Sequence, residues 1–600
     1  MKEFISLAKI SVLLIICICF LFFPDNAFTD TENRIAEPDV KKYTGDISKK
    51  YPSLDNSLEL TSYRTITGFS NMVPFSLALL EKGKTAMKED SRKNAIKFFK
   101  DAITLSPDMP QSYIYMAKAN FSFSSEGITS SVGYLFSAWK ALTNNIWWSF
   151  RVAGIFMSSL YLSLYMSVVA LFIILICSGF RLYLHDVMED ARKIFLLLPA
   201  IVLLFIGPVF SLVAFILPFW SYLKEKEKGL LYGIFIAVFA VLITLPYHAT
   251  FLNAYSDQNL RNIVNVNSGL FTGDKSDTLS GRDDFESVFT LALSKKRRGD
   301  FKEAINLYET LLGQKNDAII FNNIANCYVG MSDYKTATTY YDKSLATSKL
   351  ASAYYNLSQV NREIFNFKDA EKYYTDALNI NADKVAVFAA LRGDSAGSSV
   401  VDEVFGINQL WSLILKRSLA DASLGSMGRL YSFSNRGFSV IMIFILAIML
   451  TVYGLMVKGS AYRCSKCGRI YCENCEDKSV TNDICIMCYR SLSEKFLLKP
   501  KERTARTVDI HRYRDSRART FKIISFLIPG GGHIFHGKTF AGFIILFTFC
   551  LFLVSLFLWT FFIPSESMNV LASTVKLVSF TGLVLIYSFV IVSIIREDVR

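Results

Sequence analysis

Six of the eleven cysteines lie in one short stretch as three Cys-x-x-Cys pairs, Cys464/Cys467, Cys472/Cys475 and Cys485/Cys488. Paired thiols at this spacing are typical ligands of a tetrahedral zinc ion. Disulfides are the alternative, which an oxidising compartment would favour. Basic residues flank the stretch and favour the reducing, cytoplasmic side of a membrane. We therefore expect a zinc ion, and a structural one because no ligand position is evidently open for catalysis.

Residues 464–489 resemble the later part of a FYVE-type treble-clef finger. In that family the ligand pairs interleave, which implies one zinc shared by Cys464, Cys467, Cys485 and Cys488. The middle pair, Cys472/Cys475, would then need a second cysteine pair upstream to complete its own zinc site. The sequence has none, because an apolar segment lies upstream. The open alternative places the metal on the first two pairs. Ala461-Tyr462-Arg463 stands where the family has a basic, His-containing lipid-binding motif, so phosphoinositide recognition is not implied.

Two other groups of ionisable residues carry weaker signals. His533 and His536 lie in a Pro-Gly-rich run before an apolar block, and we interpret this run as a tight interfacial turn rather than a metal site. By their spacing, four ionisable residues share a helical face: His185, Asp186, Glu189 and Asp190. We interpret them as a solvated charged loop, with a metal site as the alternative. The sequence shows no Ser/His/Asp set, phosphate loop or dinucleotide fingerprint. We therefore expect a protein that is not an enzyme.

The chain contains several apolar blocks of about 20 residues, which are long enough to cross a bilayer. Few charges lie inside the blocks and many lie at their flanks, as transmembrane helices require. Prolines interrupt one block, 195–220, so we expect it to be re-entrant rather than a simple crossing. The blocks lie near 154–178, 195–220, 229–250, 438–457, 540–563 and 573–595.

The distribution of charged residues and the order of the segments along the chain predict the membrane topology. Residues 1–27 run from a charged start through an apolar core to small residues, as in a secretory signal peptide, with an uncleaved signal anchor as the alternative. Either places 28–150 outside. Residues 458–522 hold 16 Lys or Arg and 8 Asp or Glu, which predicts a cytoplasmic loop attracted to anionic lipid rather than a nucleic-acid site. Residues 251–436 are then outside.

A repeat of 33 residues is the clearest pattern in the chain. Ala304, Ala337 and Ala370 follow it, and a tyrosine lies four residues after each alanine. A small alanine lets two helices approach closely, and the aromatic ring falls on the same helical face. This pattern resembles the tetratricopeptide repeat (TPR) over about 285–385. A degenerate copy at about 76–121 carries the corresponding residues Gly83, Ala95, Phe99, Ala102 and Pro107.

Such repeats stack into a solenoid with a concave groove, which implies a protein or peptide partner. The positions that we expect to face the groove are Asn322, Asn326, Tyr355, Gln359 and Arg362. Some family members clamp a carboxylate with Lys and Asn from successive repeats. Phe289 and Leu293 stand at those places in the first repeat here, so the clamp is not implied.

These features predict a mainly α fold: a multi-span helical membrane protein with an α-solenoid of TPR hairpins and a small zinc-knuckle domain. The expected parts are the signal at 1–27, an outer region at 28–150, membrane helices in 154–250, a TPR domain at 281–392, a span at 438–457, a zinc-binding basic loop at 458–522, and a Pro-Gly turn with a two-helix membrane hairpin at 523–600.

The predicted function is a non-enzymatic, membrane-anchored scaffold that binds a protein partner through the TPR groove. A bacterial inner membrane and a role in envelope assembly or complex organisation suit a signal, repeats and a Pro-Gly hairpin. The alternative is a component of a transport or secretion system whose spans form the path and whose repeats recruit substrate.

Overall fold

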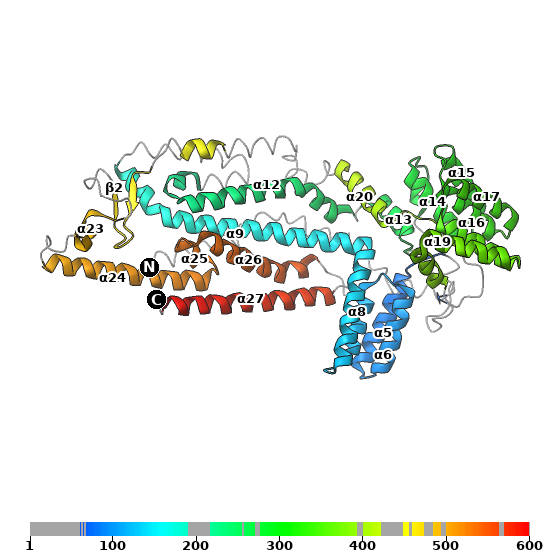
Figure 1. Cartoon of the computed structure of the whole chain (residues 1–600), viewed down its shortest axis with the longest axis horizontal. Helices are drawn as coiled ribbons and strands as arrows, with labels where there is room; N and C mark the ends of the chain where they lie inside the picture. Colours follow the sequence, from blue (N-terminus) through cyan, green and yellow to red (C-terminus); the bar gives the residue numbers. More distant parts are fainter. Residues whose placement is uncertain are drawn as a thin grey trace.

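A computed structural model describes residues 60–61, 64, 68–189, 216–254, 257–270, 276–392, 400–421, 448–454, 459–472, 484–493, 500–562 and 569–598. The described chain is mostly α-helical, as predicted. The signal segment 1–27 lies outside the described residues. Helical bundles at one end of a set of long helices, and a small β-hairpin at the other, give the molecule an elongated outline (Figure 1).

The N-terminal bundle is made of two helical hairpins. Its helices are α5 (Val73–Lys88), α6 (Arg92–Leu105), α7 (Pro110–Asn120) and α8 (Ser125–Asn144). Ala95, Phe99 and Ala102 of α6 are fully buried. The Phe99 ring lies where any side chain on Gly83 of α5 would be. The pattern of small and aromatic residues in the degenerate repeat therefore marks the contact between α5 and α6.

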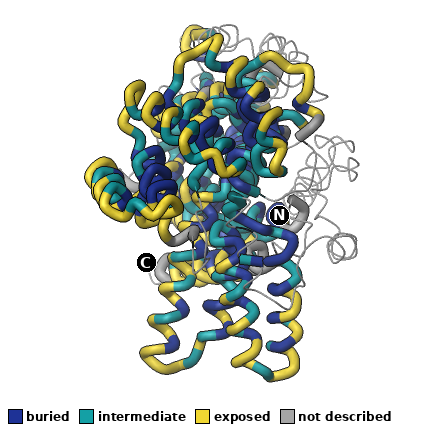
Figure 2. Tube along the Cα trace, turned by 90° about the vertical axis from the view of Figure 1, so that its right-hand side faces the viewer, coloured by how far each residue is buried: buried dark blue, intermediate teal, exposed yellow. Residues whose placement is uncertain are grey.

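The second bundle contains three hairpins in sequence. They are α14 (Phe285–Arg298) with α15 (Phe301–Leu312), α16 (Ala318–Gly330) with α17 (Tyr334–Thr347), and α18 (Ala351–Glu363) with α19 (Phe367–Arg392). Ala304, Ala337 and Ala370 are buried at the helix contacts. Seen from this end, buried residues line the facing sides of the helices and exposed residues the outer turns (Figure 2).

Four long helices connect the two ends of the molecule: α9 (Ile146–Glu189), α12 (Glu225–Asn253), α26 (Thr539–Phe562) and α27 (Asn569–Asp598). All four are long and apolar enough to cross a membrane, and they match four of the predicted blocks. Large apolar side chains are exposed along them, including Phe540, Leu577 and Phe589. Exposed apolar surface of this extent is expected where lipid replaces water.

The two remaining predicted blocks lie mostly outside the described residues. Of 195–220, only the end is described, as the 3-10 helix η3 (Leu217–Tyr222). The Tyr222 hydroxyl donates to the Asp186 carboxylate near the end of α9 (2.7 Å). The described residues on either side of this segment therefore meet, and whether the segment is re-entrant stays a prediction. Of 438–457, residues 448–454 are described and are helical.

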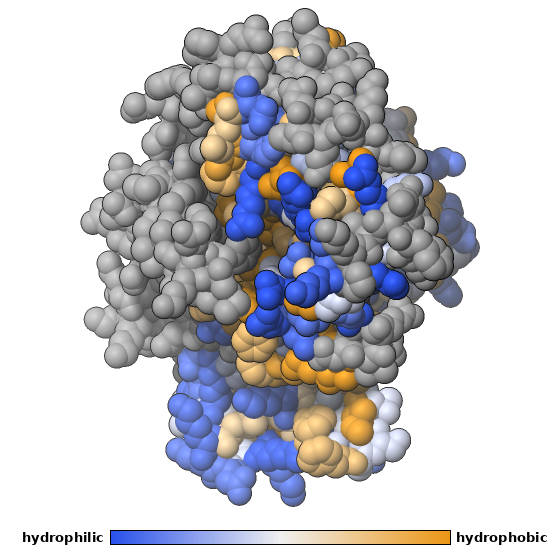
Figure 3. Space-filling model, turned by 90° about the vertical axis from the view of Figure 1, so that its left-hand side faces the viewer, coloured by the Kyte–Doolittle hydropathy of each residue, from blue (hydrophilic) through white to orange (hydrophobic). Residues whose placement is uncertain are grey.

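The other end of the molecule carries the cysteine-rich region. Strands β1 (Ala461–Arg463) and β2 (Ile470–Cys472) pair antiparallel, and α23 (Ile486–Ser493), α24 (Pro500–Leu527) and α25 (Gly531–Phe535) follow. Hydrophilic residues gather on this end (Figure 3). The Pro-Gly run forms a tight turn: Gly530 has φ +88°, and a side chain there would meet the carbonyl of Gly542 in α26.

Short elements join the bundles to the long helices: α13 (Gln258–Asn267), η5 (Ser276–Leu279) and α20 (Ile407–Asp421). Both TPR-like bundles lie at one end of the long helices, and the hairpin and α24 lie at the other (Figure 1). The described residues of 28–150 and 251–436 therefore lie at the opposite end of the long helices from those of 458–522. Which side is outside stays a prediction.

Candidate functional sites: the repeat groove and the cysteine cluster

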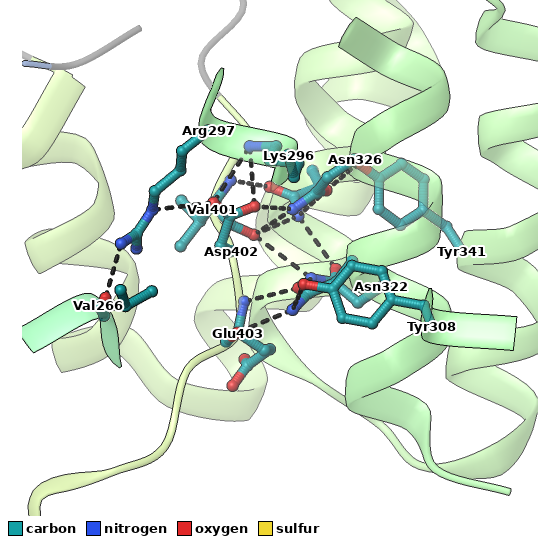
Figure 4. Close-up of polar contacts among 12 residues, drawn as sticks. Val266, Lys296, Arg297, Tyr308, Asn322, Asn326, Tyr341, Val401, Asp402 and Glu403 are labelled. Carbon is teal, nitrogen blue, oxygen red and sulfur yellow. Dashed lines mark hydrogen bonds and ion pairs between the residues drawn. The ribbon is translucent and has the colours of Figure 1, made fainter. Parts of the chain in front are cut away.

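The groove of the second bundle holds an extended segment of the same chain, residues 400–405, which we call the cis segment (Figure 4). Two asparagine amides bind its backbone in the same way. Asn356 donates to the Val401 carbonyl (2.9 Å) and accepts from the Val401 amide (2.8 Å). Asn323 makes the equivalent pair with Glu403, at 2.9 Å each. Asn323 and Asn356 are 33 residues apart, so they occupy the same place in successive repeats.

The first hairpin continues this pattern with an aromatic contact. The Phe405 ring stacks on Phe289 of α14, with ring centroids 4.7 Å apart. The Phe405 amide donates to Asn267 (3.1 Å), whose own amide donates to Thr290 of α14 (2.9 Å). Residues 401, 403 and 405 thus meet the third, second and first hairpins in turn. Alternate residues of an extended chain share one face, so residues 401, 403 and 405 present the same face of the cis segment to the bundle.

A buried ion cluster binds the residue between these positions. The Asp402 carboxylate lies 2.9 Å from the Lys296 ammonium and 3.9 Å from the Arg297 guanidinium, and it accepts a hydrogen bond from Asn326 (2.8 Å). Burial alone would raise the pKa of Asp402, but Lys296, Arg297 and Asn326 hold it below its usual value. Burial also lowers the pKa of Arg297, against the opposing effect of Asp402. The groove therefore selects a carboxylate at this place.

The predicted partner-binding residues lie at different places relative to the cis segment. Asn322 and Asn326 are buried and donate to the Val401 carbonyl, at 3.3 and 2.9 Å. Tyr355 is buried in the cluster against which Val401 packs, and Gln359 is also buried. Arg362 is exposed at the end of α18, over the Tyr374 ring. Binding of a separate partner by these residues stays a prediction.

Sequence reasoning missed the residues that bind the backbone most directly. Asn323 and Asn356 are each adjacent to a predicted position, and their spacing of one repeat was available as a signal. A carboxamide carries both a donor and an acceptor, which matches one backbone N–H and C=O pair. No repeat spacing indicates Lys296 and Arg297. They are two of the four consecutive basic residues in the last turn of α14, Lys295 to Arg298.

The second candidate site is a cluster of four cysteines, Cys464, Cys467, Cys485 and Cys488, whose sulfur atoms all lie within 4.8 Å of one another. These are the first and third pairs, the interleaved set that the treble-clef resemblance implies. Three of the four are completely buried, and Cys467 is half-buried. Gly468, with φ +75°, closes the turn after the first pair and donates to the Cys464 carbonyl (3.0 Å).

The environment of these thiols suits a bound cation. Burial alone would raise the pKa of Cys464, but backbone amides of Cys467, Cys485 and Lys466 lower it to about 7. Burial and the neighbouring thiols raise the pKa of Cys485 to about 11 and also raise that of Cys488. Several thiolates in one pocket repel one another unless a cation neutralises them. Four thiols at this separation fit a tetrahedral zinc site.

Comparison with known protein families assigns two segments of the chain to the tetratricopeptide repeat. One match covers residues 316–383, which include α16 to α18 and most of α19. The other covers residues 77–109 in the N-terminal bundle. Comparison with curated proteins gives no match. Both matches fall inside the segments that the repeat pattern predicts, and the chain therefore carries tetratricopeptide repeats in two separate segments.

Proposed function

We propose that the protein is a non-enzymatic, membrane-anchored TPR scaffold whose groove binds an extended, acidic segment of a protein partner. The observation that carries the proposal is the pair Asn323 and Asn356, which bind backbone groups two residues apart from equivalent places in two repeats. A groove that binds backbone groups accepts any extended chain, and its side-chain contacts then select the sequence.

The selecting contacts define the ligand class. Lys296 and Arg297 require a carboxylate, and Phe289 offers a flat apolar surface to an aromatic side chain three residues further along. A second carboxylate fits beside Ser352, whose hydroxyl donates to Glu403 (2.5 Å). The partner segment therefore resembles Val-Asp-Glu-Val-Phe and competes with the cis segment. Its apparent affinity depends on how often the groove is open.

The anchor is proposed from composition and exposure. In the part of the chain that the structure describes, four helices could cross a membrane, and a signal-like N-terminus favours a bacterial inner membrane and a role in envelope assembly or complex organisation. A transport path would be supported by a buried ion pair between spans. Among the described residues, α9 and α12 instead share an apolar cluster, with hydrogen bonds from Ser158 to His248 and from Tyr161 to Thr244. Apolar packing of this kind supports the scaffold.

We also propose that a structural zinc ion is bound by Cys464, Cys467, Cys485 and Cys488. The ion would fold the short segment around β1, β2 and α23, because binding free energy becomes folding free energy in small metal modules. The basic helix α24, which follows, would lie near anionic lipid.

The groove proposal is tested by titrating a fluorescent peptide, Val-Val-Asp-Glu-Val-Phe-Gly, into the full chain in detergent. Asp402→Asn removes the carboxylate of the cis segment and leaves Lys296 and Arg297 in place. Breaking one side of a buried pair costs about 3–5 kcal/mol, so this variant opens the groove. We expect it to bind the peptide at least tenfold more tightly than the original chain, an estimate kept well below that cost because a competing peptide must also order itself.

Two further variants make the titration specific. Glu371→Gln removes an exposed carboxylate of α19 and should bind the peptide as the original chain does. Asn323→Ala added to Asp402→Asn should abolish the gain, since it removes the contact with the peptide backbone. Equal binding with and without Asn323, or no binding by the opened variant, would contradict the proposal.

A further inference from the structure

A second group of metal-ligating side chains lies apart from the four-cysteine cluster. His185 and Glu189 of α9 and Cys472 of β2 place one ligand atom each within 4.8 Å of the others. We propose that these three residues form a second metal site, which takes a borderline divalent cation such as Zn²⁺. In the structure the end of α9 lies beside the β-hairpin (Figure 1).

The helix supplies two of the ligands by its own geometry. His185 and Glu189 are four residues apart, so their side chains share one face in the last turn of α9. Histidine nitrogen and carboxylate oxygen are both common zinc ligands, and a thiolate is the third common type. The interpretation of this segment as solvated needs correction at its centre, because Asp186 is completely buried.

The contacts of Asp186 place the thiol of Cys472 beside His185 and Glu189. The Asp186 carboxylate accepts hydrogen bonds from the Ser460 amide and hydroxyl, at 2.8 Å each, and from the Tyr222 hydroxyl (2.7 Å). Ser460 directly precedes β1, and Ala461 of β1 pairs with Cys472 of β2. Arg463, at the other end of β1, donates to the Ser178 carbonyl of α9 (3.0 Å). The hairpin is thus fixed on α9 at both ends of β1.

Burial is graded across the three ligands. Cys472 is buried, His185 is half-buried and Glu189 is exposed. A cation can therefore enter from the Glu189 side and reach the buried thiol. The treble-clef resemblance implied a further cysteine pair upstream as partner of Cys472, and the sequence has none there. The structure brings a histidine and a carboxylate from the first half of the chain instead. Cys475, the other thiol of the middle pair, lies outside the described residues.

The two metal sites would have different roles. The four-cysteine site joins residues of one short segment, so its ion would fold that segment. The second site joins the hairpin to α9, so its ion would attach the cysteine-rich region to a helix that the proposed function places in the membrane. Loss of the second ion should loosen this attachment and leave the first ion bound.

The test is the metal content of the full chain, purified in detergent with zinc present and measured by mass spectrometry of the metal. We expect two zinc ions per chain. Glu189→Gln and His185→Gln keep side-chain size and lie at a helix end, so the variants should fold and should each hold one ion. Cys472→Ser should also hold one. The control Glu225→Gln removes an exposed carboxylate at the start of α12 and should keep two.

Cobalt substitution identifies which ion is lost. The bands from thiolate-to-cobalt charge transfer arise mainly from the four-cysteine site, so Glu189→Gln should keep most of their intensity. Cys488→Ser should lose most of it and keep the weaker signal of the second site. Two ions retained in both Glu189→Gln and His185→Gln would overturn the proposal. So would a single ion in the original chain that remains after Cys472→Ser.

Discussion

Asn356→Ala tests how strongly the groove holds the cis segment. The substitution removes both hydrogen bonds between this side chain and Val401. The Val401 carbonyl keeps its bond from Asn326, whereas the Val401 amide loses the acceptor that Asn356 provided. A net hydrogen bond is worth about 1 kcal/mol, and an unsatisfied, partly buried donor adds a similar cost. We therefore expect release of the segment to become easier by about 1–3 kcal/mol, or roughly 5- to 150-fold.

Hydrogen exchange, followed by mass spectrometry on the full chain, measures how much more easily the cis segment is released. Peptides that cover residues 400–406 should exchange faster by that factor, because amide exchange follows the free energy of local opening. The control Asn361→Ala removes the same group from the same helix, where it donates to the Leu357 carbonyl within α18. Protection that is equal in Asn356→Ala and the original chain would refute the view that the paired asparagines hold the segment.

Three further perturbations test other parts of the structure. Ala337→Trp should destabilise the second bundle by roughly 1–3 kcal/mol or more in urea unfolding, because its site is fully buried, whereas Trp at exposed Thr339 should not. The folded pKa of Asp402 is lowered, so its stabilising effect should be complete at neutral pH and lost as the pH falls below about 4; unfolding curves of Asp402→Asn should lack this step. Gly530→Ala should lower the melting temperature of the full chain, since the residue has φ +88° and its Cβ would meet Gly542, a strain of about 1–3 kcal/mol.

The sequence predicted the repeats well because their signal is local and periodic. Ala304, Ala337 and Ala370 mark helix contacts within single hairpins, so a period of one repeat reveals them directly. The apolar blocks were equally plain, and four of them are long helices in the structure. The ligand set of the four-cysteine cluster followed from a resemblance and not from spacing, because the spacing alone left two arrangements open.

Contacts between distant parts of the chain could not be predicted in the same way. The cis segment is a short run with no periodicity, and it contacts asparagines that lie 45 and 80 residues earlier in the sequence. His185 and Cys472 meet only because Asp186 fixes the hairpin on α9. Each of these contacts depends on how whole elements pack, and a single sequence carries no local signal for such packing.

The proposed function requires a membrane that separates the groove from the cysteine cluster. Labelling with a membrane-impermeant maleimide tests this separation, with Cys introduced at Ser276 or Ser479 and the original chain as background for native thiols. We expect Ser276→Cys to be labelled in intact spheroplasts and Ser479→Cys to be labelled only after the membrane is opened. Labelling of both positions from the same side would contradict it.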